Sequence, residues 1–284
     1  MHYTNMLSLC FERFARYRFH PRLQRWINAA YVKIFDIKLD EFDTLASFPN
    51  LNALFTRSLV KMRPFDKAKF HLIAPCDSRI MEMGLCQEDY AMQIKGKSYR
   101  VSDFVRKKLE EGYYFVNFYL SPRDYHRFHA PLNLKVKYLE FIQGKLLSVC
   151  EKSLLKHNEV FTQNKRVVLE CEDEFGESFY LIAVGALNVG KIQINFAPEV
   201  VEFKESQSVS FEPPISLQKG DEIGSFLMGS TIVLLTKNWH YDLKIGEEVY
   251  FGQCIAAHSS KTQTIESQIP KDSQDSNYFE DKSS

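Results

Sequence analysis

The chain has 284 residues, enough for one sizeable domain with appendages or for two small domains. Its 36 lysines and arginines equal its 36 aspartates and glutamates, so no overall positive field points to a nucleic-acid partner. The six cysteines contain no Cys-x-x-Cys pair, and their scatter favours reduced thiols over a disulfide framework or a zinc site. We therefore expect neither a metal nor a nucleic-acid partner.

Residues 1–45 are predicted to be helical and amphipathic. Pro21 suits a first helical turn, and a stripe at helical spacing follows it, made of Leu23, Trp26, Ile27, Ala30, Tyr31 and Ile34. Basic residues dominate this segment, among them Arg16, Arg18, Arg22 and Arg25. Two interpretations stay open: the segment lies in the interface of an anionic membrane with its arginines at the headgroups, or it packs on the protein's own core.

The rest of the chain is predicted to be mostly β-structure. A short capped helix is expected within residues 48–59, and residues 46–258 are expected to form the main domain of an α+β protein with a β-rich core resembling a barrel or sandwich. The polar residues 259–284 are predicted to be a disordered tail. The predicted strands cover residues 113–120, 135–142, 166–170, 179–184, 191–196 and 230–236.

The apolar run 226–234 contains an unusual Gly229-Ser230-Thr231. Glycine permits a strained turn that would bring the Ser230 hydroxyl towards the Gly229 carbonyl. Attack there would turn the amide into an ester, and elimination followed by hydrolysis would leave a pyruvoyl group at a new N-terminus. The alternative is a β-bulge in a core strand.

Two histidines and one aspartate are further candidates for chemistry. His126 and His129 lie in one proline-flanked segment, residues 121–131, where interleaved arginines favour acid–base work over a metal site. Asp77 lies in an apolar, proline-marked stretch, and an Asx-turn is its structural alternative. Asp77, a histidine and Ser230 could together form an acid–base–nucleophile set.

Several of these stretches together resemble the phosphatidylserine decarboxylases. The resemblance covers roughly residues 48–258 and runs in the order found in that family. The matching motifs are Ile94-Lys95-Gly96, residues 121–131, Asn164-Lys165-Arg166-Val167, residues 184–190 and Met228-Gly229-Ser230-Thr231.

The resemblance implies a self-processing proenzyme. Cleavage between Gly229 and Ser230 would give a β chain, 1–229, and an α chain, 230–284, that begins with a covalent pyruvoyl group made from Ser230. The family's processing triad falls on Asp77, His129 and Ser230, and its decarboxylation residue falls on His126. The pyruvoyl carbonyl would form a Schiff base with phosphatidylserine and yield phosphatidylethanolamine and CO₂, without a metal or pyridoxal phosphate.

The implied substrate stays in its bilayer, which favours a peripheral membrane protein at the cytoplasmic face of a bacterial membrane. The sequence leaves the oligomeric state open, a homodimer included. Three other functions are weighed beside this one: a pyruvoyl-dependent decarboxylase of a soluble amino acid, a Ser-His-Asp hydrolase, and a non-enzymatic β-barrel interaction module. The hydrolase is disfavoured because residues 228–232 lack the second glycine of the Gly-x-Ser-x-Gly elbow.

Overall fold

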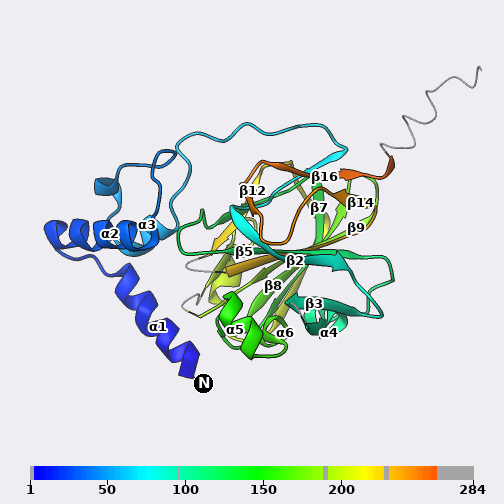
Figure 1. Cartoon of the computed structure of the whole chain (residues 1–284), viewed down its shortest axis with the longest axis horizontal. Helices are drawn as coiled ribbons and strands as arrows, with labels where there is room; N and C mark the ends of the chain where they lie inside the picture. The colour runs from blue at the N-terminus through cyan, green and yellow to red at the C-terminus, as the bar shows by residue number, and fades with distance from the viewer. Residues whose placement is uncertain (1–2, 95, 188–190, 227–229, 261–284) are drawn as a thin grey trace, which may run out of the picture.

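The computed structural model describes residues 3–94, 96–187, 191–226 and 230–260. Figure 1 shows a helical N-terminal segment on one side of a strand-rich core. This confirms the predicted α+β class with a helical segment preceding a β-rich core. The predicted polar tail falls almost entirely outside the described residues.

The helical segment contains two longer helices and two short ones. Pro21 occupies the first turn of its helix, as the sequence predicts, and the Asn50 side chain caps the last helix by accepting a hydrogen bond from the Ala53 N–H at 2.8 Å. No helix in the described part of the chain is both long and apolar enough to cross a membrane. The elements are α1 (Tyr3–Arg16), α2 (Pro21–Phe35), η1 (Leu45–Ser47) and α3 (Leu51–Phe55).

Helix α2 packs on the protein through a mixed polar and apolar face and leaves several large apolar side chains exposed. Its buried side chains are Gln24, Asn28 and Tyr31, and Asn28 accepts a hydrogen bond from Gln24 at 2.9 Å and donates one to the carbonyl of Phe48 at 3.0 Å. Trp26 is 69% exposed. The predicted stripe is therefore split: Tyr31 packs on the protein, whereas Leu23, Trp26 and Ile34 are exposed.

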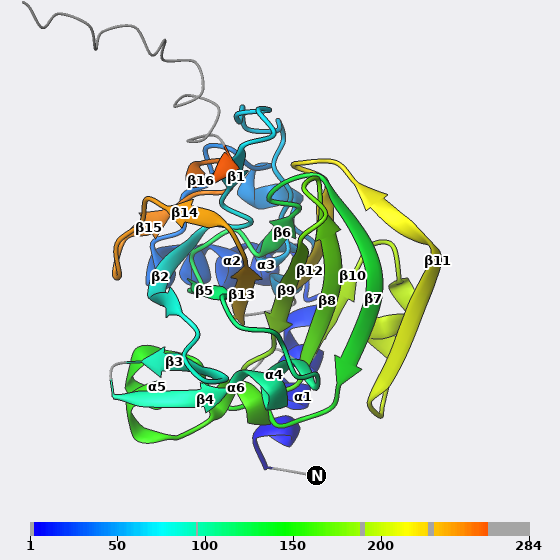
Figure 2. The same ribbon diagram turned by 90° about the vertical axis from the view of Figure 1, so that its right-hand side faces the viewer.

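The core is an eight-stranded antiparallel sheet with the order β11-β7-β8-β9-β13-β5-β2-β15. In Figure 2 its strands run across the view from β11 on the right to β2 and β15 on the left. Strand β13 lies inside this sheet between β9 and β5, and all seven of its residues are buried. An unbroken apolar run is typical of a strand covered on both faces. The strands are β2 (Ser78–Leu85), β5 (Tyr114–Leu120), β7 (Leu134–Ile142), β8 (Arg166–Asp173), β9 (Ser178–Val184), β11 (Gln207–Leu217), β13 (Ser230–Thr236) and β15 (Glu248–Val249).

Three smaller sheets and several short helices complete the described core. The sheet β10-β12-β6 consists of Ile192–Ile194, Glu222–Phe226 and Arg127–His129, and the sheet β1-β16-β14 consists of His71–Ile73, Cys254–His258 and Trp239–Tyr241. Strands β3 (Tyr90–Ile94) and β4 (Lys97–Arg100) form a hairpin. The remaining elements are α4 (Val101–Val105), α5 (Glu151–Lys156), α6 (Val160–Gln163) and η2 (Pro198–Glu202).

The described strands form open sheets, so the barrel part of the prediction is corrected. The eight-stranded sheet ends at β11 on one side and at β15 on the other, and the two edges are not paired with each other. Pro213 and Pro214 lie within β11 and have no backbone N–H to donate, which is typical of an edge strand. Strand β15 has only two residues and cannot supply a matching edge.

Candidate active site

Ser230 is the first residue of β13, where it pairs with Leu120 at the end of β5. It is fully buried, and its hydroxyl has no hydrogen-bond partner among the described residues. The pairing with β5 continues without a register shift to Thr236, so the β-bulge alternative is not found within Ser230–Thr236. Gly229, the other half of the predicted cleavage site, lies outside the described residues.

Other buried polar atoms near Ser230 also have no partner among the described residues. They are the hydroxyls of Ser121 and Thr231, which follow Leu120 and Ser230 in the chain. Nε2 of His126, in the same motif as Ser121, also has no partner among the described residues. Most buried polar groups in folded proteins are hydrogen-bonded, so a group of unpaired ones calls for an explanation. A reaction centre is such an explanation.

His126 is held as a neutral imidazole with one nitrogen open. Its Nδ1 lies 2.8 Å from the carbonyl oxygen of Asp124, which only accepts hydrogen bonds, so Nδ1 carries the proton and Nε2 the lone pair. The ring packs against Phe55, with 3.9 Å between the ring centres. Complete burial lowers the pKa of His126 to about 3.

The loop that carries His126 is braced from the helical segment. Arg57, which is buried, donates to the carbonyls of Arg123 at 2.7 Å and of Asp124 at 3.1 Å. The Asp124 carboxylate accepts from the Ser121 N–H at 2.6 Å and closes the turn. Burial raises the pKa of Asp124 to about 6. The region just after α3 therefore fixes where His126 lies.

His129 ends β6 and has a different set of partners from His126. Its Nδ1 donates to the carbonyl of Gly220 at 2.9 Å, and its Nε2 accepts from the Tyr125 hydroxyl at 3.1 Å. Its ring stacks on Phe251, with 3.8 Å between the ring centres and 16° between the planes. Burial lowers the pKa of His129. The two histidines thus lie in one motif but have different hydrogen-bond and ring partners. Among the described ranges, no group of histidine, cysteine or acidic residues could hold a metal ion.

Asp77 is buried and makes long-range contacts. It accepts two hydrogen bonds from Arg63, the longer at 3.0 Å, and one from the Phe251 N–H at 2.8 Å. Arg63 also donates to Glu41, which follows α2. These partners are distant in sequence, so the carboxylate does not form the Asx-turn that the sequence left open.

Phe251 brings Asp77 and His129 next to each other. Its backbone donates to Asp77 while its ring stacks on His129, and the His129 N–H bonds the carbonyl of Pro75, two residues before Asp77. No direct hydrogen bond joins Asp77 to His129, or His129 to Ser230, in the described contacts. The triad therefore stays a prediction, with two members adjacent and unbonded.

Comparison with known proteins identifies the chain. The family model described as phosphatidylserine decarboxylase matches residues 51–257. A protein named phosphatidylserine decarboxylase proenzyme from Helicobacter pylori is 46% identical over 258 residues, spanning 89% of this chain and 96% of the relative. A protein of the same name from Campylobacter jejuni is 36% identical over 270 residues, spanning 90% of this chain and all of the relative. The chain belongs to the phosphatidylserine decarboxylase family.

Membership of the phosphatidylserine decarboxylase family supports a decarboxylase, and the word proenzyme in the relatives' names is consistent with two chains from one precursor. A relative of the same name from Plasmodium knowlesi is 33% identical over 213 residues, 68% of this chain and 60% of the relative. The matched residues 51–257 include the four predicted site side chains.

Sequence reasoning missed three side chains that surround the predicted ones in this decarboxylase. Tyr125 lies in the motif of residues 121–131, but the sequence does not indicate that its hydroxyl forms a hydrogen bond with His129. Arg63, followed by a proline, has the pattern of a helix stop, whereas it pairs with Asp77. Phe251 carries no sequence signal, since its role depends on strands that meet only in the fold.

Proposed function

We propose that this protein converts phosphatidylserine to phosphatidylethanolamine and CO₂ by means of a pyruvoyl group made from Ser230. The observation that carries the proposal is the buried, unbonded Ser230 hydroxyl in a member of this family. Such a serine fits the origin of the group, because its oxygen is shielded from water and no described residue holds it. When present, the pyruvoyl group would supply the electron-accepting carbonyl that decarboxylation needs, without a metal or pyridoxal phosphate.

In the processing step, His129 is the proposed base. The Nδ1 proton is committed to the Gly220 carbonyl, so Nε2 is the nitrogen that accepts a proton, once the Tyr125 hydroxyl has moved aside. Nε2 would take the Ser230 proton while the serine oxygen attacks the carbonyl of Gly229. Burial keeps His129 neutral and able to act as a base, because it lowers the pKa of the imidazole.

Asp77 would stabilise the positive charge that His129 gains. The carboxylate acts on the pKa of His129 in the opposite direction to burial, although more weakly. Because Phe251 contacts both groups, the charge of Asp77 would act through space across a dry contact. Cleavage would then leave a β chain, 1–229, and an α chain, 230–284.

His126 is the proposed residue for turnover. An ion pair with a charged histidine would stabilise the substrate carboxylate before CO₂ leaves and so slow the reaction. A neutral imidazole makes no such ion pair. Its open Nε2 carries a lone pair, so it would first accept a proton that the substrate ammonium loses on forming the Schiff base, and would then deliver that proton to the carbon that CO₂ leaves. The low pKa of His126 is compatible with this role, since the proton need only be carried transiently.

The membrane role is proposed from the exposed side of α2. Trp26 and Ile34 are 69% and 74% exposed, while Gln24 and Asn28 are buried beside Tyr31 on the other side of this helix. Such a distribution is unfavourable in water and favourable when the outer face enters the headgroup region of a bilayer. With arginines beside it, this face suits the anionic cytoplasmic surface of a bacterial membrane.

A product assay tests the proposal. Purified protein is mixed with vesicles of phosphatidylcholine and phosphatidylserine, and we expect equal amounts of phosphatidylethanolamine and CO₂, and neither from Ser230→Ala. Release of serine or fatty acid would instead indicate a hydrolase. Decarboxylation of a free amino acid but not of the lipid would indicate the soluble-substrate alternative.

A further inference from the structure

A cationic pocket lies where the helical segment meets the sheet β10-β12-β6. It has a volume of about 450 Å³ and receives side chains from the end of α1, from α3 and from all three strands of this sheet. Three arginines line it, Arg16, Arg18 and Arg127, together with uncharged polar side chains such as Asn50 and Ser225. No acidic side chain is among its described lining residues, so the pocket favours an anion.

The three arginines differ in how far their charge is already neutralised. Arg127 pairs with Glu222 at 2.8 Å, and Arg16 pairs with Glu12 at 3.3 Å. Arg18 has no acidic partner among the described residues and is exposed. Arg18 therefore has its guanidinium available for an incoming anion, and a guanidinium binds phosphate oxygens through two parallel hydrogen bonds.

Two lining residues of the pocket, Arg127 and Ser225, are neighbours of His126 in the chain and in the sheet. Ser225 of β12 pairs with Arg127 of β6, and Arg127 directly follows His126. The next residue of β12, Phe226, donates its backbone N–H to the carbonyl of His126 at 2.9 Å. In phosphatidylserine, a single methylene and an ester oxygen separate the phosphate from the carbon that carries the amine and the carboxylate. A substrate reacting beside His126 must therefore place its phosphate nearby.

We propose that this pocket binds the phosphodiester of a phospholipid headgroup, with Arg18 as its principal charged contact. The inference rests on the proposed function and adds a substrate-binding residue to it. A lipid is favoured over free phosphate because two exposed apolar side chains, Phe14 of α1 and Tyr17 just after this helix, are close in the chain to the pocket residues Arg16 and Arg18. An arginine next to such side chains suits the depth of the phosphate layer in a bilayer.

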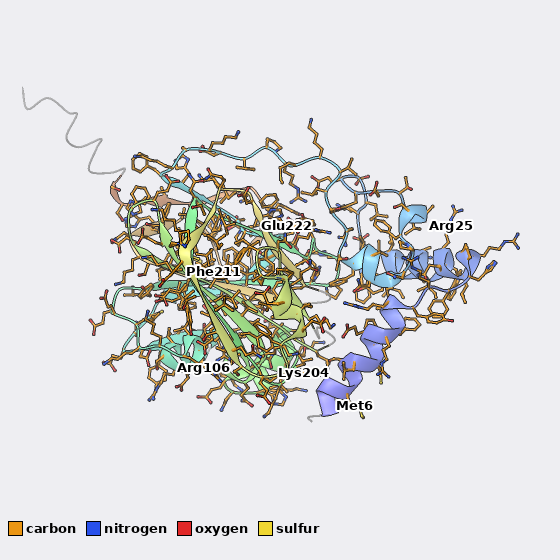
Figure 3. All side chains as sticks on the ribbon, turned by 180° about the vertical axis from the view of Figure 1, so that it is seen from behind. Met6, Arg25, Arg106, Lys204, Phe211 and Glu222 are labelled. Atoms are coloured by element: carbon orange, nitrogen blue, oxygen red, sulfur yellow. The ribbon has the colours of Figure 1, made fainter. Side chains whose placement is uncertain are left out.

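The test removes the charge of Arg18 and compares it with a matched change elsewhere on the helical segment. Arg18→Gln is paired with Lys33→Gln, which removes one charge from an exposed position of α2 that does not line the pocket. The substrate is dihexanoyl phosphatidylserine below its micelle-forming concentration, so that attraction to a membrane surface plays no part. Arg25, which projects from the outer part of the segment in Figure 3, is avoided because it belongs to the proposed membrane face.

We expect Arg18→Gln to raise KM roughly ten- to a hundredfold, as for loss of a charged hydrogen bond, while kcat and chain cleavage stay unchanged. Arg18→Lys should raise KM less than Arg18→Gln does, since lysine keeps the positive charge but cannot form the two parallel hydrogen bonds of a guanidinium. Lys33→Gln should leave KM unchanged. Equal KM values for Arg18→Gln and the unsubstituted protein would overturn the proposal.

A binding arm separates this inference from the proposed reaction. Dihexanoyl phosphatidylglycerol, which has the phosphodiester but no serine, should raise the melting temperature of the unsubstituted protein and of Lys33→Gln, and not that of Arg18→Gln. This result would support the pocket even if phosphatidylserine were not decarboxylated. No shift in any protein would overturn it, and an equal shift with the same concentration of inorganic phosphate would overturn the assignment to a lipid.

Discussion

The buried, neutral state of His126 makes a quantitative prediction about acid stability. Its pKa is about 3 in the folded protein and about 6.5 in an unfolded chain. Below pH 6.5 the unfolded state therefore binds a proton that the folded state refuses, so stability is full above this pH and falls as the pH falls towards 3. We expect the substitution His126→Gln to remove this loss, because glutamine does not titrate.

The size of the effect follows from the two pKa values. Between pH 7.5 and 5.0, protonation of the unfolded histidine lowers the free energy of unfolding by about 2 kcal/mol. The folded state contributes almost nothing to this difference as long as its pKa lies well below 5, which the complete burial of the ring ensures. The value thus depends mainly on the ordinary titration of histidine.

Urea unfolding at the two pH values measures the effect. The protein carries Ser230→Ala so that it stays one chain, and the fluorescence of buried Trp239 reports on the core. Titrating groups distant from His126 act equally with and without His126→Gln, so their contributions cancel in the comparison. The parent should lose about 2 kcal/mol more than the variant on acidification. Equal losses would refute the assignment of a buried, neutral His126.

Three further predictions concern processing and the membrane. His129→Ala or Asp77→Ala should slow chain cleavage, whereas His126→Ala should be cleaved and then lose roughly 10²- to 10⁴-fold in decarboxylation rate. Gel electrophoresis measures the cleavage and CO₂ release measures the decarboxylation. Normal cleavage of His129→Ala would contradict its role as base. Tyr125→Phe removes the hydrogen bond that favours neutral His129, so the pH midpoint of cleavage should rise by up to about one unit; an unchanged midpoint would argue against that bond. Trp26→Ser should weaken sedimentation with anionic vesicles by up to about 2 kcal/mol while chain cleavage proceeds normally; unchanged vesicle binding would exclude the membrane face.

Point substitution in α2 is a sharper test than removal of residues 1–40. Tyr31 and Asn28 are buried, and Asn28 donates to the carbonyl of Phe48. A truncation would therefore uncover part of the protein as well as remove the proposed membrane face. Trp26 is largely exposed, so its replacement leaves those contacts intact.

Local pattern predicted β5, β7, β8, β9 and β13 of the eight-stranded sheet, but not β2, β11 or β15. The run that became β13 and the run that became β9 are continuous apolar segments bounded by turns, and both lie in the sheet interior with buried side chains. Pro21 marked the start of α2 because its ring geometry and missing N–H suit a first turn. Where covalent geometry or an unbroken apolar run decides the structure, the sequence was informative.

Long-range contacts decide what the sequence could not predict. Asp77 is bonded by Phe251, 174 residues away, and no local pattern specifies that pairing. The sequence also did not show the orientation of α2, because the buried Gln24 and Asn28 bond each other and the backbone of Phe19 and Phe48, which no local pattern specifies. Closure of a sheet likewise depends on its two edges meeting, which strand prediction alone does not test.

Intact-mass measurement of the purified protein tests the central claim most directly. We predict two chains, one ending at Gly229 and one of 55 residues (284 minus 229) whose N-terminus is blocked by a pyruvoyl group in place of Ser230. Ser230→Ala should give a single 284-residue chain, because alanine has no hydroxyl to attack the preceding carbonyl. A single unsplit chain from active, unsubstituted protein, or the 55-residue fragment from Ser230→Ala, would contradict the account.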